Sequence, residues 1–95
     1  MTHSLDNLET LGILNQALEQ FGSVPQQIKA IEEMAELTKE VCKEIGGYLS
    51  NREAVIEELA DVQIMIWQMQ LLYGEDAVQQ QIAIKLHRLN ERMNR

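Results

Sequence analysis

Apolar residues recur along the chain at steps of three and four, the spacing of an amphipathic α-helix. The first such run covers residues 5–21 and stops at Gly22. Its apolar positions are Leu8, Leu11, Leu14, Leu18 and Phe21. The pattern predicts a first helix that buries one of its faces.

A second helical run is predicted from near Val24 to the pair Gly46 and Gly47. Ser23 precedes it as the predicted N-cap, with Gln26 three residues later as in a capping box. Its repeating stripe, which we expect to face the rest of a helix bundle, consists of Ile28, Ile31, Ala35, Thr38, Cys42 and Ile45.

The third run, residues 51–73, is apolar on nearly every side from Leu59 onward. Ser50 and Glu53 repeat the capping-box signal before this run, and Gly74 ends it. A helix of this kind has to be covered on several sides. We therefore expect it to contact both its own bundle and another subunit.

The fourth run begins at Glu75 and carries basic residues toward its C-terminal end, where they complement the helix dipole. The connection from Gly46 to Ser50 is short enough to make the second and third helices antiparallel neighbours. The pattern thus predicts an all-α four-helix bundle, with residues 1–95 as one domain. Because a chain of this size buries only about 60% of its unfolded surface, we expect oligomerisation, as a homodimer or homotetramer, to complete the core.

Composition narrows the classes of partner. The 95 residues contain 8 Lys and Arg against 15 Asp and Glu, a net charge of −7, which argues against nucleic-acid binding. The most apolar stretch, residues 59–73, is shorter than the ~20 residues that span a bilayer, so no membrane partner is expected. Cys42 stands alone and the chain opens without a leader pattern, which favours a cytoplasmic protein.

Two pairs of acidic residues carry the candidate chemistry. Glu33 and Glu36 share one face of the second helix, and Glu58 and Asp61 share one face of the third. Asp61 lies within the apolar block, where a buried carboxylate needs a cation, a hydrogen-bond donor or a raised pKa. Neither pair contains histidine, which favours Mg²⁺ or Mn²⁺ over iron or zinc. Solvated glutamate pairs on a helix surface remain the simpler alternative.

These acidic segments also resemble a known family. The segment 32–37, Glu-Glu-Met-Ala-Glu-Leu, and the segment 58–62, Glu-Leu-Ala-Asp-Val, resemble the Glu-Glu-x-x-Glu … Glu-x-x-Asp signature of the MazG-like all-α nucleoside triphosphate pyrophosphatases. The similarity extends from Phe21 to the Lys-Leu-x-Arg-Leu-x-x-Arg pattern at 85–92.

The resemblance implies Mg²⁺-dependent hydrolysis of a nucleoside triphosphate (NTP or dNTP) between its α and β phosphates, which releases a monophosphate and pyrophosphate. Matched to the family motif, Glu33, Glu36, Glu58 and Asp61 are the metal ligands. Glu32 matches the first glutamate, as an outer ligand or a residue that orients water. The preferred base and sugar are left open.

Lys85 and Arg88, three residues apart, are candidate ligands for phosphate oxygens. Ordinary complementation of the helix dipole is the alternative role for both. Within the superfamily, a phosphoribosyl-ATP pyrophosphohydrolase is less favoured, because Ile64 and Met65 stand where that enzyme commonly has Tyr-His. From a different class, a non-catalytic interaction module could use the apolar face of the third helix to dock a partner.

Overall fold

The computed structural model describes residues 5–47 and 50–95, and these form helices without any strand. The helices are α1 (Leu8–Phe21), α2 (Ser23–Gly46), α3 (Arg52–Tyr73) and α4 (Glu75–Met93). The predicted all-α fold and the order of its four helical runs are therefore confirmed. The predicted short connection includes residues 48–49, which lie outside the described part of the chain.

The start of α1 differs from the prediction. Asn7 caps the helix, since its Oδ1 accepts a hydrogen bond from the main-chain N–H of Thr10 at 3.1 Å. The helix therefore begins at Leu8 rather than at Leu5. Leu5 is nevertheless buried, so it contributes to the core from outside the helix.

Neither predicted capping box forms. Ser23 lies inside α2, whose N-cap is Gly22 and receives no side-chain hydrogen bond. At α3 the N-cap is Asn51 rather than Ser50, and the Asn51 side chain reaches back to Glu40 on α2 instead of capping its own helix. The predicted glycine stops are confirmed, because Gly47 ends α2 with a φ of 70° and Gly74 ends α3 with a φ of 112°.

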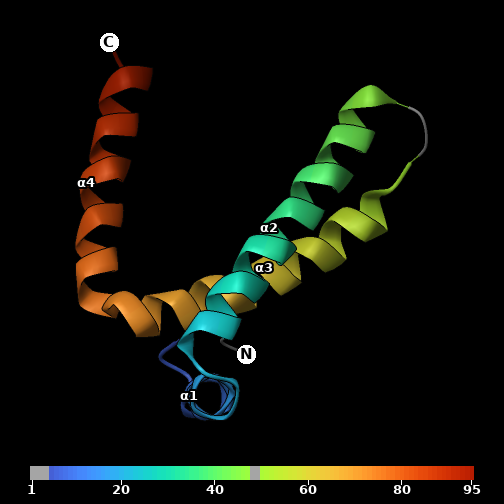
Figure 1. Cartoon of the computed structure of the whole chain (residues 1–95). Helices are drawn as coiled ribbons and strands as arrows, with labels where there is room; N and C mark the ends of the chain where they lie inside the picture. Colours follow the sequence, from blue (N-terminus) through green and yellow to red (C-terminus); the bar gives the residue numbers. More distant parts are fainter. Residues whose placement is uncertain (1–4, 48–49) are drawn as a thin grey trace.

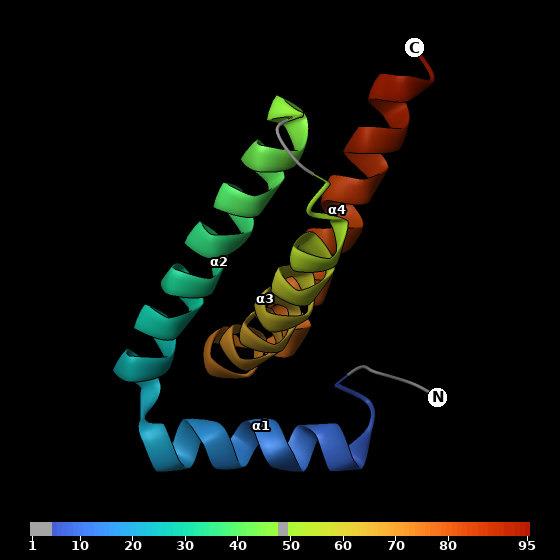
Figure 2. The same cartoon turned by 90° about the vertical axis from the view of Figure 1, so that its right-hand side faces the viewer.

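The helices form an open arrangement rather than a closed bundle. Helices α2 and α3 lie antiparallel and side by side, as Figures 1 and 2 show. Helix α1 crosses near the N-terminal end of α2, and α4 turns away after Gly74 as the second arm of a V (Figure 1). Among the described helices, α4 packs only against α3.

The core is small and partly polar. Its buried apolar residues are Leu5, Leu14, Ala30, Val62 and Met65. Gln26 and Gln68 are buried with them, and Gln26 Nε2 donates a hydrogen bond to Gln68 Oε1 at 2.6 Å. This bond joins α2 to α3 at the end nearest α1. None of the described helices combines the length and the hydropathy that a membrane span requires.

The stripe predicted to face the bundle from α2 points outward instead. Ile31 is 63% exposed and Ile45 is 81% exposed. The buried or half-buried side of α2 carries Gln26, Ala30, Glu33, Leu37 and Glu40. The prediction was wrong because α2 packs on α3 through a side on which polar residues outnumber apolar ones, which leaves the apolar stripe uncovered.

Candidate metal centre

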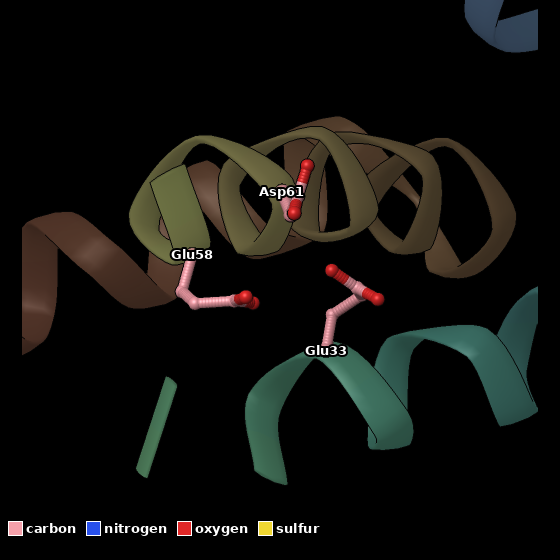
Figure 3. A group of neighbouring side chains, drawn as sticks. All are labelled: Glu33, Glu58 and Asp61. Carbon is pink, nitrogen blue, oxygen red and sulfur yellow. The ribbon is translucent and has the colours of Figure 1, made fainter. Parts of the chain in front are cut away.

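Three carboxylates from two helices converge where α2 and α3 run side by side. Glu33 comes from α2, and Glu58 and Asp61 come from α3. One oxygen from each lies within 4.8 Å of the others. Figure 3 shows the Glu33 and Glu58 side chains extending toward one another across the gap between the helices, with Asp61 one turn further along α3. The antiparallel pairing thus brings together residues that are 25 or more positions apart.

The three side chains differ in their access to solvent. The side chain of Glu33 is 14% exposed and Glu58 is half-buried, whereas Asp61 is exposed. The expectation that Asp61 is the buried carboxylate is therefore wrong. The apolar residues around it in sequence, such as Leu59 and Ile64, are themselves exposed in this chain, so they do not enclose it.

Glu58 holds the buried oxygen instead. Its Oε2 is inaccessible to solvent and has no hydrogen-bond partner among the described residues. Burial raises the pKa of the Glu58 carboxyl, and the negative charges of Glu33 and Asp61 raise it further. An unpaired carboxylate oxygen beside two other carboxylates is a position where a cation relieves both desolvation and repulsion.

Lys29 is the residue at this site that the sequence analysis did not single out. Its Nζ lies 3.3 Å from Glu33 Oε1, one helical turn away. Together with Glu33, Asp61, Ile64 and Met65 it lines a depression of about 250 Å³. In the sequence, Lys29 stands four residues before Glu33. This spacing could have indicated the contact, but it is also common in solvated ion pairs on helix surfaces. Lys29 places a positive charge at the rim of the acidic site.

The other two predicted acidic residues lie outside the triad of Glu33, Glu58 and Asp61. Glu36 is exposed, but its negative charge contributes to the raised pKa of Glu58, so it is close enough to act on the site. Glu32 is also exposed, and it does not belong to the group of converging carboxylates. The structure therefore brings together three of the four predicted metal ligands.

The predicted phosphate ligands lie elsewhere in the chain. Lys85 and Arg88 are exposed on α4, where they form a basic strip with Arg92 and with Arg95 just beyond the helix; Glu91 lies within this strip. Among the described helices, α4 packs against α3 but not against α2. The basic strip therefore does not lie beside the triad of its own chain.

The donor set fits a small hard cation. Mg²⁺ binds oxygen ligands at about 2.1 Å in an octahedron, so its ligand oxygens lie roughly 3–4.2 Å apart. The triad oxygens lie within 4.8 Å of one another, a separation that small side-chain rotations can close. The buried Glu58 Oε2 would gain the partner that the protein does not supply. Mn²⁺, which accepts the same oxygen ligands, fits equally well.

Comparisons of the chain with protein-family models, with curated proteins and with solved structures gave no match. A functional assignment consequently has two supports, which are the geometry of the triad and the acidic motif that supplies it.

Proposed function

We propose that this protein is a cytoplasmic, Mg²⁺-dependent nucleotide pyrophosphohydrolase of the MazG-like type. It would hydrolyse a nucleoside triphosphate between the α and β phosphates. The observation that carries the proposal is the convergence of Glu33, Glu58 and Asp61 within 4.8 Å, with a buried and unpartnered oxygen on Glu58. These are three of the four positions that the family motif assigns to metal ligands.

In this proposal the triad holds the metal, with Glu36 as a fourth ligand reached by rotation of its side chain. The bound ion would neutralise triphosphate charge and lower the pKa of a coordinated water. Glu32 would act from outside the ligand set, on the orientation of water. The exposure of Asp61 suits this role, because the ion has to remain accessible to a bulky anionic substrate.

Lys29 and the basic strip on α4 supply the candidate phosphate contacts. A dication on Glu33 would weaken the Lys29–Glu33 ion pair and leave Lys29 available for a phosphate oxygen. Lys85 and Arg88 would have to come from another copy of the chain, since α4 leads away from the triad of its own chain. We expect the active form to contain two or four copies.

A non-catalytic interaction module is the second candidate. The observation that favours it is the exposure of large apolar side chains on α3, including Leu59, Ile64 and Ile66. Such a module would bind neither Mg²⁺ nor nucleotides. A magnesium titration followed by thermal unfolding separates the two functions, because ligand binding to the folded state raises the Tm.

The decisive experiment incubates the protein with a panel of NTPs and dNTPs plus Mg²⁺ and identifies the products. Release of monophosphate and pyrophosphate supports the proposal. Release of orthophosphate, or no turnover of any nucleotide at high enzyme concentration, overturns it. Manganese should replace magnesium, and chelation by EDTA should abolish the activity.

Variants test whether the triad is responsible. Glu58→Gln and Asp61→Asn keep the side-chain shapes and remove one ligand charge each, so both should abolish turnover and retain the helical circular dichroism signal. Glu19→Gln is the matched control, since Glu19 is exposed on α1 and also loses one charge. Wild-type turnover in either triad variant would contradict the proposed ligand set.

A further inference from the structure

A polar pocket lies at the vertex of the V in Figure 1, where α3 ends and α4 begins. Its volume is about 410 Å³. Trp67 and Gln70 line it from α3, and Glu75 and Asp76 line it from the first turn of α4. None of its lining residues belongs to the triad or to the depression beside Lys29. The proposed hydrolysis therefore leaves this pocket without a role.

The pocket carries an excess of negative charge. Asp6, Glu75 and Asp76 each contribute a carboxylate, and none of the described residues that line the pocket is basic. The N-terminus of α4 offsets only part of this charge, since a helix dipole places about half a positive charge there. Glu75 is half-buried and forms no ion pair with another described residue. The charge favours a cationic ligand and disfavours a phosphate.

Gln70 is the buried polar residue of the pocket. It is 8% exposed, and its side chain forms no hydrogen bond with another described residue. The other two buried glutamines, Gln26 and Gln68, are bonded to each other. Gln70 also borders an apolar groove between α2 and α3, but carbon and sulfur atoms form the wall of that groove, so the amide faces the polar pocket. A buried amide without a partner calls for a ligand that can bond to it.

The carboxylates of the pocket are too dispersed for a metal ion. Among the described residues, only the triad brings three candidate ligand atoms within 4.8 Å of one another. Asp6 precedes α1 whereas Glu75 and Asp76 begin α4, so the negative charges come from separate parts of the wall. Such a distribution matches a ligand with more than one ammonium group. Trp67 is half-buried and adds an aromatic surface, which attracts alkylammonium groups and covers the methylene groups between them.

We propose that this pocket binds an aliphatic polyamine of the size of putrescine or spermidine. The ammonium groups pair with Asp6 on one side and with Glu75 and Asp76 on the other. The methylene chain lies against Trp67. An amine N–H donates to the side-chain oxygen of Gln70, which gives the buried amide its missing partner. No residue of this site takes part in the proposed hydrolysis, so either proposal can fail without the other.

Trp67 is the only tryptophan of the chain, so its fluorescence reports on the pocket directly. Titration of the full chain with spermidine, without Mg²⁺ and at constant ionic strength, should give a saturable change in emission and a matching isotherm by calorimetry. Butylamine has one ammonium group and should bind roughly tenfold more weakly. An equal response to butylamine or to Mg²⁺ would overturn the proposal. The same holds if spermidine produces neither heat nor a change in emission.

Variants locate the site. Glu75→Gln with Asp76→Asn should weaken spermidine binding roughly tenfold. Glu53→Gln is the matched control, because Glu53 lies in the first turn of α3 and outside the pocket. Gln70→Leu should also weaken binding, but without lowering the Tm of the ligand-free protein, since its amide has no partner to lose. Binding that is lost in Glu58→Gln and retained in the Glu75 and Asp76 variant would place the polyamine at the triad and overturn the proposal.

Discussion

The side-chain amide of Asn51 donates two hydrogen bonds to Glu40, one to its main-chain oxygen at 2.7 Å and one to its Oε2 at 2.8 Å. The main-chain N–H of Asn51 also donates a hydrogen bond to Glu44 Oε2, with an N···O distance of 3.3 Å. These contacts fasten the first turn of α3 to the last turns of α2. Because Glu58 follows Asn51 by two helical turns, they help to set the level at which the carboxylates of the two helices meet.

Asn51→Ala should destabilise the protein and loosen this pairing. The variant loses two side-chain hydrogen bonds, one of them to a charged acceptor, and we expect the Tm to fall by roughly 4–8 °C. Thermal unfolding followed by circular dichroism gives this number. The control is Asn15→Ala on the exposed face of α1, which should not lower the Tm. An unchanged Tm for Asn51→Ala would show that the contact contributes nothing to the pairing of the helices.

The stability of the metal-free protein should rise as the pH falls through the raised pKa of Glu58 toward 4.5. The folded protein holds this pKa above its usual value of 4.5, chiefly by burial. In the window between the two values the folded state binds the proton more readily than the unfolded state, so stability decreases as the pH rises. Glu58→Gln should flatten this part of the profile, as measured by urea unfolding. An unchanged slope in the variant would contradict the prediction.

Glu40 should give the opposite dependence at lower pH. Its pKa is lowered, mainly by the hydrogen bond from Asn51. The stabilisation is therefore fully present above pH 4.5 and is lost as the pH falls through the lowered value. The difference in stability between wild type and Asn51→Ala should shrink over that range.

Replacement of Glu58 should change the stability of the metal-free protein and the stabilisation by Mg²⁺ in opposite directions. Glu58→Gln removes the repulsion among the triad carboxylates, so we expect the Tm of the metal-free protein to rise. The same variant should lose the increase in Tm that Mg²⁺ produces in the wild type. Glu19→Gln should behave like the wild type in both measurements. A variant that is both less stable without metal and still stabilised by Mg²⁺ would argue against the triad as the site.

The buried pair of Gln26 and Gln68 should show strong coupling. Gln68 is 3% exposed, and Gln26→Leu leaves its Oε1 without the partner seen in the structure. We expect this variant to lose about 1–3 kcal/mol of unfolding free energy. The double variant with Gln68→Leu should recover part of that loss, which a double-mutant cycle in urea measures. Additive losses would mean that the two side chains do not act as a pair.

Two glycines should respond in opposite directions to alanine. Gly74 has a φ of 112°, so Gly74→Ala strains the junction between α3 and α4 and should cost about 1–3 kcal/mol. Gly12 lies within α1, and a Cβ there would meet nothing within 4 Å. Gly12→Ala should therefore stabilise the protein by about 0.5–1 kcal/mol. Equal effects at the two positions would show that the conformation of Gly74 is not needed for the turn into α4.

Most of the fold could be predicted from local signals. The period of three and four marks each helix. Gly47 and Gly74 end α2 and α3 at the predicted positions, because glycine readily adopts the positive φ that a helix end requires. The helix starts were less predictable, because Ser, Thr, Asp and Asn compete for the same role. Asn7 takes it at α1, whereas Asn51 uses its amide for a contact 11 residues away. A local capping rule cannot anticipate such a longer-range bond.

The sequence by itself determined that the chain is helical, where its first three helices stop, and that two acidic pairs, Glu33 with Glu36 and Glu58 with Asp61, each share one helix face. Only the tertiary structure decided which faces of those helices meet. The face of α2 that packs on α3 is its more polar one, so the isoleucine stripe stays outside and the acidic residues come together. Likewise the buried oxygen belongs to Glu58 rather than to Asp61. Periodicity assigns residues to a face, but the rotation of one helix against another depends on contacts made by the whole chain.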